Sequence, residues 1–468
     1  MVFSSLIFLF VFLPAVLLSY YITPRRYRNV ILFAASLFFY AWGEPVYILL
    51  MLFSTAANYT LGLLLAGCRV KGRKARPVLW AAVLINVGLL CFFKYSAFLL
   101  QTVNFLLGTS LADPGLKLPI GISFYTFQAL SYIVDVYRGE VPAQRSFIAF
   151  GTYIALFPQL IAGPIVRYRT IAGQLVGRRE GLESFGEGVR RFVAGLGKKV
   201  LLANNLGLLW QQVQQTPPSE VTLLAAWLGI IAFALQLYFD FSGYSDMAIG
   251  LGKMFGFTFP ENFHYPYISR SITEFWRRWH ISLGSWFRDY VYIPLGGNRR
   301  GKPALYRNLL AVWLLTGLWH GAGWNFVLWG LYYGLILALE KAFLLKWLRQ
   351  ASRFTCHAYV LLLVLLGWVL FAFDSLPVGM QYLQALFGLG GAGVYDWEAL
   401  YYLYTHALLI AIALFAATPF INKVKQKLFA SSAALYYAAA TLSCLAVLLL
   451  STAYLVDTTY NPFLYFRF

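Results

Sequence analysis

Residues 315–334 read LTGLWHGAGWNFVLWGLYYG and place a histidine inside a segment as apolar as a membrane helix. The apolar run that contains this stretch, residues 309–339, is too long for one span of about 20 residues and too short for two. Basic clusters flank the run at both ends, so both ends belong on the same side of the membrane. We therefore predict two short helices that meet at WHGAGW, with His320 at the meeting point, deep in the protein.

The composition of the chain is that of a membrane protein. Of 468 residues, 60% are hydrophobic and 12% are charged, whereas soluble domains carry about 25% charged residues. The net charge of +19 comes from short Lys/Arg clusters between apolar runs, a pattern typical of cytosolic loops and not of a nucleic-acid site. We predict an all-α polytopic fold of about 10 to 12 transmembrane or re-entrant helices. We also predict interfacial amphipathic helices and a central tunnel.

The basic clusters also predict the course of the chain. If they are cytosolic, both termini lie outside the cell membrane. Residues 4–22 lack a basic leading segment and a cleavage site, so they are expected to be a retained first span. Residues 147–166 predict a broken or re-entrant element, and residues 178–199 an interfacial amphipathic helix. Further spans are expected near 358–374, 402–418 and 432–454. No linker or repeat is evident, which predicts one membrane domain over residues 1–468.

His320 is the first candidate for chemistry. An ionisable side chain at membrane depth is costly, so it indicates function unless neighbouring groups satisfy it. The alternative is a neutral imidazole that packs against, and hydrogen-bonds to, an adjacent helix. Glycines at 317, 321 and 323 favour the functional interpretation, because they would let a substrate approach the backbone closely.

Residues 271–301, SITEFWRRWHISLGSWFRDYVYIPLGGNRRG, form the second candidate. At helical spacing, large apolar side chains share one face, His280 lies at its edge, and the charged side chains share the other face. We predict one amphipathic helix on the cytosolic surface. Its arginines, Arg277 and Arg278, either face lipid headgroups or form a rim for the phosphates of an acyl donor.

Residues 235–252, LQLYFDFSGYSDMAIGLG, form the third candidate, because polar side chains interrupt an apolar helix. Asp240 and Asp246 would be costly near membrane depth unless paired or hydrogen-bonded. We predict a polar break here, with Asp246 as the N-cap of the helix that follows. The alternative is that Asp240, Ser242, Tyr244 and Asp246 line a tunnel. The scattered cysteines show no ligand spacing, so neither a disulfide framework nor a metal site is predicted.

The second and third candidates and the histidine motif together resemble the membrane-bound O-acyltransferase family. Within that family, they are most similar to the branch that acts in O-acetylation of bacterial alginate and related polysaccharides. The block at about 235–330 is the most specific part of the resemblance, which extends almost from end to end. The other matching stretches are MVFSSLIFLFVFLP at 1–14, AGPIVRY at 162–168 and YFRF at 465–468.

The resemblance implies that His320 is the catalytic residue and that His280 is a second, more cytosolic site residue. It implies a cytosolic acyl thioester as donor, most simply acetyl-CoA, with no tightly bound cofactor. It further implies an extracytoplasmic polysaccharide acceptor, a separate acetyltransferase or polysaccharide-modifying partner, membrane lipids around the chain, and a bacterial inner membrane. The residues assigned to donor binding or to the tunnel wall are Arg277, Arg278, Trp279, Trp319, Asp240, Ser242, Tyr244, Asp246 and Asn325.

On this hypothesis His320, kept neutral by apolar surroundings, acts as general base on the acceptor hydroxyl. Two alternatives remain open. One is transfer of D-alanine from a carrier protein to teichoic acid, and the other is a non-catalytic transporter or assembly scaffold.

Overall fold

The computed structural model describes residues 1–113, 115–457 and 460–462. All regular secondary structure within these residues is helical, which confirms the all-α prediction. The YFRF ending lies outside the described residues. Eight helical segments of the described chain are long and apolar enough to cross a membrane, and Phe8–Ile22 is a shorter apolar helix, so this is a multi-pass membrane protein. The eight are Ile48–Val70, Arg76–Leu107, Leu182–Gln215, Leu223–Met254, Trp324–Gln350, Arg353–Ala372, Trp397–Ala416 and Ala433–Asp457.

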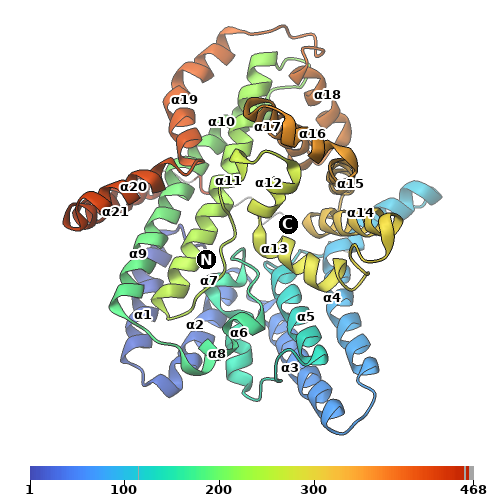
Figure 1. Cartoon of the computed structure of the whole chain (residues 1–468), viewed down its shortest axis with the longest axis vertical. Helices are drawn as coiled ribbons and strands as arrows, with labels where there is room; N and C mark the ends of the chain where they lie inside the picture. Colours follow the sequence, from blue (N-terminus) through green and yellow to red (C-terminus); the bar gives the residue numbers. More distant parts are fainter. Residues whose placement is uncertain (114, 458–459, 463–468) are drawn as a thin grey trace. The chain divides into compact units, whose positions relative to one another are not determined.

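The backbone divides into two compact units. The first unit comprises the described residues of Met1–Phe192 and Tyr244–Pro260, and the second comprises Val193–Gly243 and the described residues from Glu261 onward. The single domain predicted for the chain stays a prediction. The helices of the first unit are α1 (Leu13–Ile22), α2 (Arg28–Gly43), α3 (Ile48–Val70), α4 (Arg76–Leu107), α5 (Ile122–Arg138), α6 (Phe147–Ala155), α7 (Phe157–Leu160), α8 (Tyr168–Gly177) and most of α9 (Leu182–Gly197) (Figure 1).

The element at 147–166 is broken, as predicted. Helices α6 and α7 are separated at Leu156, and the segment after α7 is non-helical yet buried. Buried non-helical backbone needs hydrogen-bond partners from the protein. Ser36 supplies one, accepting from the backbone N–H of Phe157 at 3.0 Å, and the Gln159 side chain donates to the Tyr153 carbonyl at 2.6 Å.

The interfacial amphipathic segment predicted at 178–199 is helical over Leu182–Gly197 but does not end there, and its position at the membrane surface stays a prediction. Helix α9 continues through a π-helical turn, Lys198–Ala203, into α10 (Asn204–Gln215), giving one helical segment long enough to span. Its charged side chains do not all face headgroups, because some pair with the following long helix. In the first unit, Arg191 bonds Asp246 at 2.6 Å and Glu187 bonds Lys253 at 2.6 Å.

The predicted polar break near residue 246 is also absent. Helix α11 (Leu223–Met254) runs through this sequence without interruption, so Asp246 does not begin a helix. Partners on the preceding helical segment satisfy the carboxylates instead: Arg191 binds Asp246 in the first unit. In the second unit, Lys199 binds Asp240 at 2.7 Å, and both side chains are almost fully buried.

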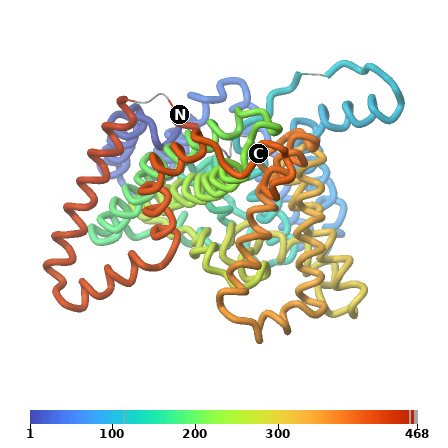
Figure 2. The backbone as a smooth tube through the Cα atoms, turned by 90° about the horizontal axis from the view of Figure 1, so that it is seen from above, coloured from blue at the N-terminus to red at the C-terminus, as the bar shows by residue number. Residues whose placement is uncertain are grey.

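The rest of the second unit carries the other two candidate motifs. The expected spans near 358–374, 402–418 and 432–454 are confirmed as helices α17 (Arg353–Ala372), α19 (Trp397–Ala416) and α21 (Ala433–Asp457). Figure 2 shows α20 (Phe420–Ser431) and α21 meeting at an angle. The helices in chain order are α12 (Ile272–Arg278), α13 (Ile281–Phe287), α14 (Gly301–His320), α15 (Trp324–Leu339), α16 (Leu345–Gln350), α17 (Arg353–Ala372), α18 (Leu376–Leu386), α19 (Trp397–Ala416), α20 (Phe420–Ser431) and α21 (Ala433–Asp457).

The buried ion pair yields a test of what holds α11 in place. Replacing Lys199 with Met leaves the Asp240 carboxylate buried without this partner, which should cost about 3 to 5 kcal/mol. The double variant Lys199→Met/Asp240→Leu removes both charges and should recover most of that loss. Thermal unfolding of the detergent-solubilised chain, followed by tryptophan fluorescence, measures both. Equal midpoints for the single and double variants would contradict a structural role of the pair.

Candidate active site

His320 is the last residue of α14, and the chain then runs extended through Gly321 and Gly323 before α15 begins at Trp324. The predicted meeting of two helices at WHGAGW is therefore confirmed. The first helix is longer than predicted, because α14 starts at Gly301 and not near residue 309. Asn308 in its early turns donates to the carbonyls of Leu295 and Gly297, which holds the preceding loop against the helix.

Gly317 and Gly321 serve helix packing, contrary to our interpretation of the glycines around His320 as space for a substrate. A side chain at Gly317 would overlap the carbonyl oxygen of Phe326, and one at Gly330 would overlap the carbonyl oxygen of Trp313. A side chain at Gly321 would overlap the Phe326 ring. Helices α14 and α15 thus touch through their backbones, as small residues allow in membrane helix pairs.

The second motif is not one amphipathic helix, as predicted, but two short helices separated by a break. Helix α12 ends at Arg278, Trp279 is extended, and His280 has a left-handed backbone with φ 46° before α13 begins. Left-handed conformations are uncommon outside glycine and persist only where the surroundings impose them. The break turns the His280 side chain inward, where only 3% of the residue is exposed.

Helix α12 has seven residues and depends on strong N-terminal capping. Ser271 accepts from the backbone N–H of Glu274 at 3.0 Å, and the Glu274 carboxylate accepts from the backbone N–H of Arg270 at 2.9 Å. A fully buried carboxylate from the end of α15, Glu340, accepts from the backbone N–H groups of Ile272 and Thr273 at 2.7 and 2.8 Å. Negative charge at a helix N-terminus is favourable. Glu340 therefore fixes α12 against α15.

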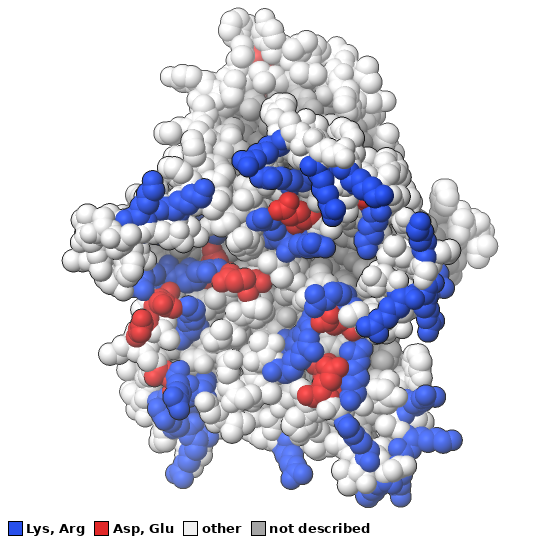
Figure 3. Space-filling view, in the orientation of Figure 1, with Lys and Arg blue, Asp and Glu red and all other residues white. Residues whose placement is uncertain are grey.

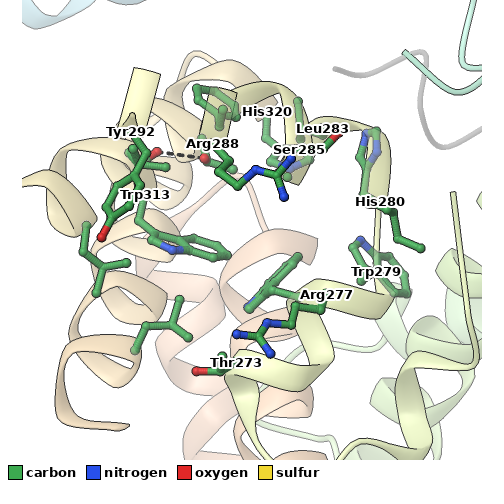
Figure 4. A pocket seen from close by; sticks show the side chains of 18 of the residues that line it. Thr273, Arg277, Trp279, His280, Leu283, Ser285, Arg288, Tyr292, Trp313 and His320 are labelled. Atoms are coloured by element: carbon green, nitrogen blue, oxygen red, sulfur yellow. Dashed lines mark hydrogen bonds between the residues drawn. The ribbon is translucent and has the colours of Figure 1, made fainter. Parts of the chain in front are cut away.

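The two motifs enclose a cavity of about 550 Å³ within the second unit (Figure 4). This volume lies in the range of small-molecule sites, about 300 to 1,000 Å³. Of the predicted site residues, His280, His320, Arg277 and Trp279 line it. The remaining lining residues are Thr273, Trp276, Ile281, Leu283, Gly284, Ser285, Phe287, Arg288, Tyr292, Leu309, Val312, Trp313, Thr316, Leu337 and Lys341.

Aromatic rings surround His320. Its imidazole meets the rings of Trp329 and Phe371 edge-on, with centroids 5.1 and 5.4 Å apart, and that of Trp319 at 5.0 Å. The residue is 3% exposed. The imidazole is therefore buried among aromatic rings and shielded from solvent.

The rim of the cavity is cationic where its interior is neutral. Arg277 of α12, Arg288 after α13 and Lys341 after α15 are all exposed and line the same cavity. Arg277 and Lys341 are close enough to interact as like charges. Figure 3 shows basic side chains gathered on the face where α12, α13 and the start of α14 lie. Like charges held together in this way favour an anionic ligand.

Other predicted site residues lie outside this cavity. Arg278 binds Glu274 at 2.8 Å and the His264 carbonyl at 3.1 Å, so its side chain is directed elsewhere. Trp319 lies between the two histidine rings, with centroids 5.9 Å from His280 and 5.0 Å from His320. Asn325 is buried beside Gly323, and Asp240 and Ser242 are buried in α11. Tyr244 and Asp246 belong to the first unit, where Tyr244 stacks on Phe3.

Sequence reasoning placed Arg288 on the charged face of the second motif without assigning it to the donor site, and it missed Lys341 and Asn262. Lys341 belongs to a basic cluster that looked like an ordinary cytosolic flank, so nothing local distinguished it. Asn262 contacts His280, as shown below, but is 18 residues away in the chain. Its loop, PENFHYP, also contains Glu261 and His264, so no local signal singled out Asn262.

Comparison with known proteins shows the family to which the chain belongs. The sequence model of the membrane-bound O-acyltransferase family matches residues 140–380. A probable alginate O-acetylase, AlgI, of Azotobacter vinelandii is 42% identical over 501 aligned positions, covering 100% of both chains. The peptidoglycan O-acetyltransferase of Helicobacter pylori is 34% identical and covers 84% of this chain and 81% of its own. The chain therefore belongs to the membrane-bound O-acyltransferase family, and it is an O-acyltransferase.

A more distant relative bears on the acyl group. The teichoic acid D-alanyltransferase of Bacillus subtilis is 29% identical over 240 residues, which are 49% of this chain and 60% of its own. The similarity to O-acetylating proteins thus extends over much more of the chain than does the similarity to this D-alanyl transferring protein.

The contact of α14 with α15 predicts that Gly317 tolerates no side chain. Gly317→Ala should lower the free energy of unfolding by about 1 to 3 kcal/mol, because the new methyl group overlaps backbone. The control is Gly88→Ala in α4, where a side chain meets nothing within 4 Å, and where alanine should stabilise the helix by up to about 1 kcal/mol. Thermal unfolding midpoints compare the two. A stabilising effect at both positions would contradict the close backbone packing.

Proposed function

We propose that this acyltransferase takes an acetyl group from cytosolic acetyl-CoA and delivers it for O-acetylation of an extracytoplasmic polysaccharide such as alginate. One observation carries the proposal: two buried histidines and three exposed cations line a single cavity. The names of the full-length relatives support acetyl as the acyl group and a polysaccharide as the acceptor.

The polarity of the cavity suits the two ends of the donor. Coenzyme A carries phosphates at one end and the reactive thioester at the other. Arg277, Arg288 and Lys341 on the rim would bind the phosphates, and the guanidinium groups can do so in bidentate fashion. The thioester would then lie in the aromatic interior beside His280 and His320. Arg278, Trp319, Asn325 and the polar residues of α11 lie outside this cavity, so a role for them in the predicted tunnel stays a prediction.

The transfer needs one proton acceptor. His320 takes the proton of the acceptor hydroxyl while that oxygen attacks the thioester carbonyl carbon. The new C–O bond forms, the C–S bond breaks, and the proton passes to the departing sulfur, so that coenzyme A leaves as a thiol. His280 binds or orients the donor. Water exclusion by the surrounding rings protects the thioester from hydrolysis.

The remaining parts of the proposal concern location and partners. We place the chain in the bacterial inner membrane, with both termini outside and the basic clusters in the cytosol. The acetyl group then reaches the polymer through a separate extracytoplasmic acetyltransferase or modifying protein. D-alanyl transfer from a carrier protein is the alternative within the family, and co-purification with an acyl carrier protein would favour it.

Replacement of His320 tests the catalytic assignment. His320→Ala should lower acetylation of the polymer in cells by about 10² to 10⁴-fold, the usual contribution of a general base, while the protein persists in the membrane. His406→Ala in α19 is a matched control, since His406 does not line the cavity. Ester content of the polymer and membrane-localised protein are the measurements. Equal ester content in wild type and His320→Ala would favour a transporter or scaffold.

Neutralising the rim tests the donor site. Arg277→Gln, Arg288→Gln and Lys341→Gln should each raise the KM for acetyl-CoA by about tenfold, the effect of losing one hydrogen bond to a charged group. They should also weaken the dependence of that KM on ionic strength. Lys427→Gln, an exposed lysine of α20, removes the same charge outside the cavity. Steady-state kinetics of the purified chain in detergent at two salt concentrations measure both effects. An unchanged KM for acetyl-CoA in all three rim variants would show that the rim does not bind the donor.

A further inference from the structure

We propose that Asn262 is a positioning residue that fixes His280 as the tautomer protonated on Nδ1, so that Nε2 accepts a hydrogen bond from the substrate. The proposal rests on the proposed function, in which His280 contacts a substrate. Asn262 is fully buried and lies on the irregular segment between α11 and α12.

The orientation of the Asn262 amide follows from its neighbours. Its Oδ1 atom lies 3.3 Å from the backbone nitrogen of Ser282 and 2.9 Å from the Ser282 hydroxyl. A backbone N–H can only donate, so the atom that faces it must be the amide oxygen and not the amide nitrogen. The same Oδ1 lies 3.1 Å from Nδ1 of His280. Because the amide oxygen only accepts, Nδ1 must carry the proton.

Asn262 also supports the strained backbone that presents the ring. Its carbonyl accepts from the backbone N–H of Ile281 at 3.0 Å, so one residue satisfies the first two N–H groups of α13. Beside it, the N–H of His264 donates to the carbonyl of Arg278 at 2.9 Å. These bonds hold the segment 262–264 against the break between α12 and α13. Ring and backbone of His280 are therefore positioned by the same residue.

The surroundings keep the ring uncharged. The Phe241 and Trp319 rings flank His280, with centroids 4.7 and 5.9 Å away, and burial lowers the pKa of His280 to about 3. Its hydrogen-bond neighbours, Asn262 and Ser282, carry no charge. The titratable groups that share its cavity are Arg277, Arg288, Tyr292, His320 and Lys341.

A neutral ring with its proton on Nδ1 offers a lone pair on Nε2. The group that it binds must therefore be a donor: an amide N–H of the acyl donor's arm, or the hydroxyl of the acceptor. Kinetics distinguish these two possibilities. Loss of a bond to the acyl donor raises the KM for acetyl-CoA, whereas loss of a bond made to the acceptor in the transition state lowers kcat.

The tautomer itself can be measured without activity. The full chain, labelled with nitrogen-15 at its five histidines, is studied in lipid by nitrogen-15 NMR, and His280→Gln assigns the His280 signals. We expect Nδ1 protonated and Nε2 unprotonated in the wild type and in Ser282→Ala, which removes a different donor to the same amide oxygen. Asn262→Leu should lose this preference. A wild-type ring protonated on Nε2, or an unchanged ring in Asn262→Leu, would overturn the proposal.

A pH profile separates positioning from folding. Asn262→Asp keeps an acceptor for Nδ1 but adds a negative charge, which raises the pKa of His280. Its activity should match wild type at high pH and fall as pH decreases, because the imidazolium ion no longer accepts. Asn262→Leu should lower kcat/KM about tenfold at every pH. Identical losses in the two variants at all pH values would point to a structural role only. Wild type inactive with acetyl-CoA would instead refute the proposed function and leave the NMR result standing.

Discussion

Helices in a membrane satisfy their own backbone groups, and every break in a helix frees groups for which lipid offers no partner. The candidate site of this protein is built on two such breaks, one before His280 and one after His320. At the first, Asn262 accepts from the first two N–H groups of α13, while Glu340 accepts from the N–H groups of Ile272 and Thr273 at the other end of α12. At the second, Gly317 and Gly323 accept from the chain on either side of the turn.

The same reasoning separates structural from functional charges. Asp240, Asp246 and Glu340 each have a cationic partner or several hydrogen-bond donors, so their burial is compensated within the protein. On the cavity rim Arg288 also has a partner, Asp289 at 2.6 Å, but Arg277 and Lys341 interact with each other as like charges. Placing them together opposes folding, and an anion bound between them would remove that repulsion. The arrangement of charges on the rim thus lowers the stability of the fold but favours binding of the charged end of a donor.

The local sequence pattern was sufficient to predict one of the two helix breaks at the site but not the other. Segment length and flanking charge were sufficient to predict the break after His320, since both are properties of one stretch. The break before His280 was not predictable, because apolar residues continue at helical spacing through 276–287 while the deciding partner is Asn262. The cap assigned to Asp246 failed for the same reason: Arg191 is 55 residues away. Amphipathic spacing shows that a face is polar without showing which distant residue satisfies it.

The size of the cavity follows from how small and large residues alternate on one hairpin. Trp313, Gly317 and His320 recur at helical spacing on the same face of α14. Gly317 brings α15 into backbone contact, whereas Trp313 packs against Trp276 of α12 with ring centroids 4.8 Å apart. Tyr333 of α15 meets Trp276 at the same distance. The glycine closes the hairpin and the rings hold α12 away from it, so the space between remains open beside the histidine. A change in the size of the transferred acyl group would therefore require exchange of these rings, while the glycine contact stays fixed.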